Sequence, residues 1–279
     1  MGVTTVPVGP PGSVLPRLQG LELEDQAWFP PTIRDLATDY LRFIETRLDL
    51  DRPLVPVLAE VLRNSNTSTV VDLCAGGGGP VPALQAALAA EGLRVEFVLT
   101  DLYPNASAFA EAERAADPPG SIRGVLQPID ARDVPPDLVG CRSLFNGFHH
   151  FRPEAARAIL RDAANRRQPL VIFEISDRRV TNLLLILLLT PLASAISALF
   201  IRPFRWRRLF WNWVIPAVPF TCTWDGVMSQ LRVYTVEELA AMARDTAVDG
   251  YQWRAGHLRA GPRPGRWTYL IGQPTATPE

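Results

Sequence analysis

The chain contains no lysine: all 28 of its basic residues are arginine, set against 29 acidic residues. The absence of lysine excludes Schiff-base chemistry on a lysine and excludes the phosphate-binding lysine of P-loop proteins. The formal net charge is −1, so the sequence lacks the overall basic field that holds nucleic acid. We therefore expect no nucleic acid partner.

Cysteine is also scarce. Cys74, Cys141 and Cys222 are too few and too far apart for a disulfide framework or for a zinc site with paired ligands. We expect no metal. The first sixteen residues lack the basic and apolar regions of a signal peptide. The sequence therefore predicts a cytoplasmic protein, and its richness in proline and alanine is typical of a GC-rich bacterial genome.

Short β-rich runs alternate with helical stretches through the middle of the chain. This alternation predicts an α/β fold, in which a largely parallel sheet is buried between helices on both faces. We expect seven strands, at 69–74, 94–100, 124–128, 142–146, 170–175, 251–258 and 266–272. We expect helices at 31–50, 81–90, 106–116, 153–165 and 235–243, with a further helix ending near residue 63. Thr235 and Glu238 have the spacing of a capping box at the start of the last helix.

The domain organisation follows from these elements and from a hydrophobic insertion after the fifth strand. We expect a flexible tail over 1–20, a helical cap over 21–64, a sheet domain over 65–176 and 234–274, a hydrophobic lid over 177–233 and a short tail over 275–279.

The insertion contains a run of 19 uncharged residues, Leu183 to Ile201, which is long enough to cross a membrane. A single crossing would separate two parts of one sheet domain, and 209–220 is too short and proline-rich to return. We therefore expect no span, but a lid that lines an apolar substrate pocket and whose outer face pairs two subunits. The alternative is peripheral binding to membrane headgroups through four arginines: Arg202, Arg205, Arg207 and Arg208.

A glycine-rich loop, Cys74 to Gly79, follows the first strand and precedes a helix, as nucleotide-type sites do. A simple tight turn is the alternative. NAD is disfavoured because Val81 stands where the third glycine of its motif belongs, and because Asp72 would repel a pyrophosphate. Asp101 ends the second strand and Asp130 follows the third. Three acids at successive strand ends suit a ligand with an ammonium group, ribose hydroxyls and a purine.

Through these residues and the segment from Phe145 to His150, the sequence resembles the class I S-adenosylmethionine-dependent methyltransferases. The resemblance covers about residues 25–274 and implies a Rossmann-like fold, with S-adenosyl-L-methionine as cofactor and S-adenosyl-L-homocysteine as product. Cys74 departs from the family, which has a glycine there. The implied cofactor-binding residues are Asp72, Cys74, Ala75, Gly76 and Gly78 for the methionine portion, Asp101 for the ribose, Ile129, Asp130 and Ala131 for the adenine, and Leu102 and Asn146 beside them.

Three further segments, beginning at Asp25, Trp224 and Tyr269, look like those of bacterial small-molecule methyltransferases, among them actinomycete enzymes that methylate indole C3 of tryptophan-derived metabolites. We expect an apolar aromatic acceptor such as a tryptophan-derived cyclic dipeptide. O- or N-methylation of another secondary metabolite or lipid-like acceptor is the alternative. The expected substrate contacts are Trp28, Tyr40, Phe148, Trp224 and Arg232. For all of these except Phe148, packing within the lid is the other interpretation.

His149 and His150 follow the fourth strand, where either imidazole can serve as a base near neutral pH. We favour His150, with His149 and then Tyr40 as further candidates; the alternative is that the histidines are packed structural residues. Glu174 either faces the cleft or caps the next loop with Arg178. The rival to an enzyme is a non-catalytic or membrane-surface protein with the same fold, but the intact set of three acids favours the enzyme.

Overall fold

The computed structural model describes residues 4–5, 14–175, 177–259 and 266–275. They form two compact units, and each is considered by itself. The sheet unit contains the described residues of 1–9, 51–175 and 234–279, and the helical unit contains those of 10–50 and 176–233.

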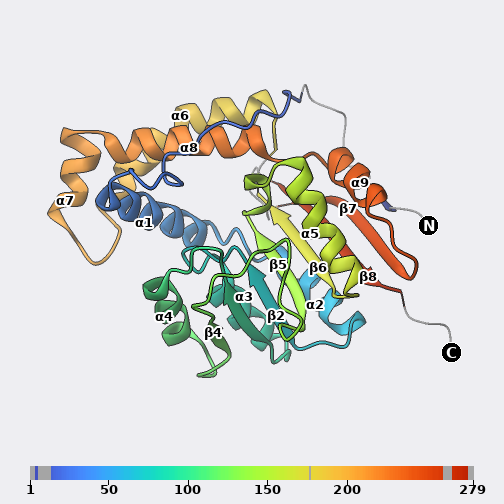
Figure 1. Cartoon of the computed structure of the whole chain (residues 1–279). Coiled ribbons are helices and arrows are strands. Elements are labelled where there is room, and N and C mark those ends of the chain that lie inside the picture. The colour runs from blue at the N-terminus through green and yellow to red at the C-terminus, as the bar shows by residue number, and fades with distance from the viewer. Residues whose placement is uncertain (1–3, 6–13, 176, 260–265, 276–279) are drawn as a thin grey trace. The chain divides into compact units, whose positions relative to one another are not determined.

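The sheet unit is built on eight strands in the order β1-β7-β8-β6-β5-β2-β3-β4 (Figure 1). β8 runs antiparallel to its neighbours β6 and β7, and the other pairs are parallel. The strands are β1 (Thr4–Thr5), β2 (Thr69–Leu73), β3 (Glu96–Thr100), β4 (Ile122–Gly124), β5 (Cys141–Phe145), β6 (Leu170–Glu174), β7 (Tyr251–Arg259) and β8 (Arg266–Pro274).

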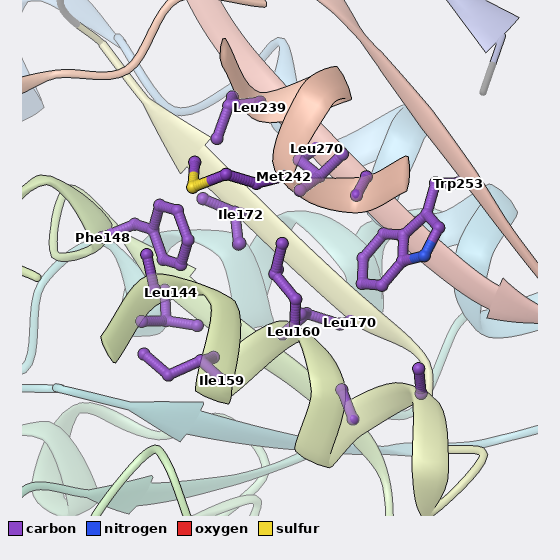
Figure 2. Close-up of a cluster of buried hydrophobic side chains, with 14 of the residues drawn as sticks. Leu144, Phe148, Ile159, Leu160, Leu170, Ile172, Leu239, Met242, Trp253 and Leu270 are labelled. Carbon is purple, nitrogen blue, oxygen red and sulfur yellow. The ribbon is translucent and has the colours of Figure 1, made fainter. Parts of the chain in front are cut away.

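Helices cover both faces of this sheet, which confirms the expected Rossmann-like α/β class (Figure 1). They are α2 (Leu54–Asn64), α3 (Val81–Ala90), α4 (Ala106–Ala115), α5 (Pro153–Asn165) and α9 (Val236–Asp245), with a 3₁₀ turn η1 (Phe148–His150) after β5. Side chains of α5 and α9 interlock with those of β5, β6 and β8 in one buried cluster, shown in Figure 2. The capping box of α9 is present: the Thr235 hydroxyl accepts from the Glu238 amide, and the Glu238 carboxylate accepts from the Thr235 amide.

Two expectations for local structure need revision. The third strand ends at Gly124 instead of beginning there. The Val125 amide still donates to the Leu99 carbonyl, but the chain then leaves the sheet toward Pro128, which has no N–H to give a partner strand. Within the expected tail, Thr4 and Thr5 add a parallel strand beside β7. The remaining residues of 1–13 and residues 276–279 lie outside the described part of the chain.

The helical unit consists of α1 (Pro31–Leu48), α6 (Val180–Ser197), α7 (Trp206–Leu209), a short π-helical turn η2 (Phe210–Val214) and α8 (Ala217–Arg232). α8 packs against α1 and α6, and residues such as Leu36, Tyr40, Val218 and Cys222 form its apolar core. Ion pairs made by buried arginines connect its segments: Arg208 lies 2.7 Å from the partly exposed Asp39, and Arg232 lies 2.9 Å from the buried Glu22.

Among the described helices, α6 alone is long and apolar enough to cross a membrane, judged by length and composition. Its mean hydropathy is 2.0, and only 17% of it is buried. The strands that precede and follow the insertion, β6 and β8, are hydrogen-bonded neighbours in one sheet. A single crossing by α6 without a return would place β6 and β8 on opposite sides of the membrane, which their pairing does not allow. The exposed apolar surface of α6 therefore needs another explanation.

Candidate cofactor site

The candidate site lies at the carboxyl ends of the central parallel strands. From β2 the chain first builds β3 and β4 on one side, and then returns to place β5 on the other side of β2. Adjacent loops diverge at such a switch point, and open α/β sheets bind their ligands there. Asp72 lies near the end of β2, and the other two acids and the histidines found by sequence follow β3, β4 and β5.

The loop after β2 has the backbone conformation that a close ligand contact requires. Cys74, Gly76, Gly78 and Gly79 all have positive φ, at 70°, 48°, 89° and 47°. Such values are costly for most residues and cost glycine little. Cys74 is thus held in a left-handed conformation in spite of its side chain. The loop is anchored by hydrogen bonds from the Ala75 amide to the Thr100 carbonyl and from the Gly78 amide to the Ala75 carbonyl.

Asp72 is a buried carboxyl group immediately before this loop. Its Oδ1 accepts a 2.8 Å hydrogen bond from the hydroxyl of Ser143 on β5. Burial is the main cause that raises the pKa of Asp72 to about 8; the bond from Ser143 acts in the opposite direction, and the nearby charge of Asp101 adds to the increase. A cationic ligand that approached Asp72 would favour its ionised form.

Asp101, directly after β3, accepts a backbone hydrogen bond on each of its two carboxylate oxygens, one of them from the glycine-rich loop. Its Oδ2 accepts from the Gly76 amide at 2.9 Å, and its Oδ1 accepts from the Tyr103 amide at 2.8 Å. Each carboxylate oxygen can accept more than one bond, so the group retains acceptor capacity for a diol. The next side chain, Leu102, is exposed.

Asp130 follows β4 and is paired with a neighbour in sequence. Arg132 donates to both carboxylate oxygens, with Nε 2.9 Å from Oδ1 and 3.0 Å from Oδ2. These bonds lower the pKa of Asp130, which keeps it ionised. Ile129 and Ala131 on either side are buried, and the Ile129 amide donates to the Asp101 carbonyl. The second and third acidic loops are therefore fixed to each other.

The pKa of the Cys74 thiol is affected by four acidic side chains, which therefore lie near it. Burial is the main cause that raises its pKa, and the charges of Asp101, Asp72, Asp130 and Glu174 raise it further, in that order. The four carboxyl groups therefore act electrostatically on one point at this edge of the sheet.

The end of β5 is shaped by Asn146 and Gly147. Asn146 has a φ of 51°, and its side-chain oxygen accepts from the Ile175 amide at 2.9 Å, so it joins the ends of β5 and β6. A Cβ on Gly147 would lie 3.3 Å from the Cβ of Cys74. Glycine at 147 thus lets the loops after β2 and β5 approach closely.

His149 and Glu174 form a buried pair beside these loops. His149 Nδ1 lies 2.7 Å from Glu174 Oε2, and the His149 amide donates to Oε1 at 3.0 Å. Glu174 therefore faces His149 in this arrangement. His150 is less buried, and its ring centroid lies 4.2 Å from that of His149.

The other sequence candidates are placed as follows. Phe148 is fully buried among Phe151, Tyr234 and the α5 side chains, where it serves packing. Tyr40 lies in the core of the helical unit, where burial raises its pKa to about 12. In the same unit Trp28 is exposed, Trp224 stacks on Phe220 and donates to the Leu21 carbonyl, and Arg232 is buried with Glu22.

Ser143 and Arg132 were missed by the sequence interpretation. Ser143 is the direct partner of Asp72, yet the two are 71 residues apart. The only sequence signal was a hydroxyl group in the middle of a predicted strand. Arg132, two residues after Asp130, had a clearer signal in its opposite charge.

No family model matches the sequence, and no curated protein matches it. Among solved structures, the plantazolicin methyltransferase in complex with S-adenosyl-L-homocysteine has a TM-score of 0.53 at 9% identity, covering 90% of this chain and 94% of that one. An O-methyltransferase family protein from Burkholderia thailandensis has a TM-score of 0.49 at 20% identity, covering 88% of this chain and 63% of that one. An O-methyltransferase from neocarzinostatin biosynthesis has a TM-score of 0.49 at 16% identity, covering 88% and 59%.

This chain spans about 60% of the length of the last two proteins. The first likeness extends over nearly the whole of both chains and establishes the fold: the chain has the fold of the class I methyltransferases.

Proposed function

We propose that the protein is an S-adenosyl-L-methionine-dependent methyltransferase. The observation that carries the proposal is the convergence of Asp72, Asp101 and Asp130 at the switch point of a methyltransferase-fold sheet, beside a loop with left-handed backbone. Asp72 and the loop hold the methionine portion, Asp101 the ribose hydroxyls, and Asp130 with Ile129 and Ala131 the adenine.

The charge of the site suits the direction of the reaction. The cofactor carries a positive sulfonium, which a cluster of carboxylates attracts. Transfer of the methyl group breaks the carbon–sulfur bond and leaves a neutral thioether, while the acceptor gains the methyl group and loses a proton. The product is therefore held less strongly than the cofactor, which favours its release.

Asp101→Ala is expected to weaken the binding of S-adenosyl-L-homocysteine about tenfold or more in calorimetry, because a charged hydrogen-bond acceptor is worth about 1.5–3 kcal/mol. Asp137→Ala, which removes an exposed acid from the same unit, serves as the matched control and is expected to leave the affinity unchanged. Equal affinity in both variants would remove the ribose assignment.

For the acceptor we propose an electron-rich aromatic molecule, with an indole methylated at carbon three as the first choice. Support comes from Trp211 and Trp224 of the helical unit, whose rings can hold a flat apolar ring by area and offset stacking. Attack by C3 on the methyl carbon leaves positive charge on the indole nitrogen, and a base that takes the N–H proton completes the substitution.

The acceptor is tested by incubating the purified protein with labelled cofactor and a panel of tryptophan-derived cyclic dipeptides, phenols, amines and lipids. A product with a quaternary C3, identified by mass spectrometry and NMR, is expected. Turnover of phenols or amines alone would discard the indole assignment and leave the methyltransferase proposal standing.

We also propose that His149 is the base and that Glu174 positions it. The 2.7 Å contact at Nδ1 fixes the orientation of the imidazole ring, whose other nitrogen, Nε2, is the atom that we propose takes the proton. Because of this contact we favour His149 over His150, the residue that the sequence favoured.

A further inference from the structure

Helix α6 buries small polar side chains and exposes large apolar ones. Its buried positions include Ser194 and Ser197, whereas large apolar side chains face solvent along its length, with Leu188 71% exposed and Leu192 59% exposed. A helix on the surface of a soluble protein has the reverse pattern. We call its exposed side the leucine face, which consists of Val180, Leu184, Leu185, Leu187, Leu188, Leu189, Leu192 and Ile196.

The inward polar groups of α6 are satisfied within the helical unit. The Ser194 hydroxyl donates to Asn212 Oδ1 at 3.0 Å, and the Ser197 hydroxyl donates to the Ser194 carbonyl at 2.9 Å. The helix is thus docked by small polar residues and keeps its leucines outside. Helices that contact lipid share this distribution, because lipid replaces the protein core as the apolar phase.

The apolar surface continues past the end of α6 into residues 199–215, which we call the tip. The tip exposes large apolar side chains, with Trp206 77% exposed, and contains an apolar cavity of about 440 Å³. The cavity is lined by Leu199, Trp206, Leu209, Phe210, Trp213 and Val214. Tryptophan is enriched at the boundary between lipid and water.

The positive charge of this region favours an anionic partner. From Arg178 to Trp224 the sequence has six arginines and no acidic residue. Arg202 and Arg207 in the tip are exposed, and neither forms an ion pair within the described chain. A symmetric dimer through this surface would bring the same positive side chains together. An anionic bilayer satisfies both the leucines and the arginines.

We propose that the leucine face and the tip form a docking surface for an anionic lipid bilayer. The apolar side chains enter the headgroup and acyl boundary, an acyl chain fills the tip cavity, and Arg202 and Arg207 bind lipid phosphates. The helix lies in the interface and does not cross it. The proposal concerns binding alone and does not depend on the proposed function.

Flotation with vesicles of phosphatidylcholine, with and without phosphatidylglycerol, tests the docking surface. The full chain is expected to float with the anionic vesicles and to be released by carbonate. Leu188→Glu with Leu192→Glu is expected to weaken binding at least tenfold, since each change replaces an inserted leucine with a charge. The matched control is Leu126→Glu with Val139→Glu, which places the same charges at sites 59% and 61% exposed on the sheet unit, and is expected to bind normally.

The arginines are tested separately with Arg202→Gln and Arg207→Gln. Each is expected to lower affinity for the anionic vesicles about fivefold, and the pair to remove the preference for phosphatidylglycerol. Arg161→Gln with Arg244→Gln, which removes two exposed arginines from the sheet unit, is expected to have no effect. Circular dichroism melting verifies that each variant is folded.

Three outcomes overturn the proposal. The first is failure of the folded, unmodified chain to float with either vesicle. The second is resistance to carbonate extraction, which would make α6 a membrane span. The third is a dimer in light scattering that Leu188→Glu with Leu192→Glu converts to a monomer while vesicle binding is absent, which would show that a second copy covers the leucine face.

Discussion

Asp72→Asn is expected to stabilise the folded protein at about pH 8 and to weaken cofactor binding at the same time. The unfolded chain ionises this carboxyl near pH 3.8, but in the folded protein its burial raises the pKa to about 8. Between these values the folded state binds more protons than the unfolded state, so stability falls as pH rises. Asparagine cannot ionise and can still hydrogen-bond to Ser143, so this loss disappears.

The expected gain is on the order of a few kcal/mol at about pH 8 and close to zero at about pH 4, measured by urea unfolding without cofactor. Asp137→Asn, at an exposed site, is the control and should change stability little at either pH. If Asp72→Asn were less stable than the original protein at pH 8, the ionised carboxylate of Asp72 would not destabilise the folded state, and the prediction would be wrong.

Cofactor binding is expected to change in the opposite direction. The ammonium group of S-adenosyl-L-homocysteine favours the carboxylate form of Asp72, so binding near pH 7 should release a proton, and affinity should rise toward pH 8. Asp72→Asn should lose at least tenfold in affinity and abolish this proton release. Calorimetry in buffers of different ionisation enthalpy measures both. A stability gain coupled to a loss of affinity is the mark of a residue retained for function.

His149→Gln is expected to lower kcat by about 10² to 10⁴-fold on the acceptor that the panel identifies, which is the usual contribution of a general base. Glutamine retains a donor for Glu174, so the pair remains hydrogen-bonded and the affinity for S-adenosyl-L-homocysteine should stay within about twofold of the original. Rapid-quench or steady-state product formation provides the measurement.

Two comparison variants distinguish this role from packing. Glu174→Gln should also reduce kcat, because the carboxylate that fixes the orientation of the ring is lost. His150→Ala should have the smaller effect. A larger loss in His150→Ala, with His149→Gln nearly unchanged, would return the role of base to His150.

Local signals were sufficient for much of the sheet unit. α3 and α5 begin and end at the residues expected, because helix boundaries depend on nearby prolines and on apolar spacing. The acids at strand ends were visible because each follows a short apolar run. At the edge of the sheet, the boundary of β4 was misjudged, since a short edge strand has few apolar contacts to mark it.

Contacts between distant segments were beyond the reach of the sequence. Asp72 meets Ser143 across 71 residues, and His149 meets Glu174 across 25. Each depends on which strands become neighbours, and strand order is decided by the packing of the whole sheet. The elevated pKa of Asp72 follows from the same burial.

The sequence by itself determined the fold class, the glycine-rich loop, the three acidic strand ends and the presence of a long apolar run. Each of these follows from a pattern of residues that are close together in the sequence. The tertiary structure alone decided which histidine pairs with a carboxylate and which way the leucines of α6 face. A run that is apolar on every side has no preferred direction in sequence. Packing against α8 and η2 fixes it, by turning Ser194 and Ser197 inward and leaving the leucines outside.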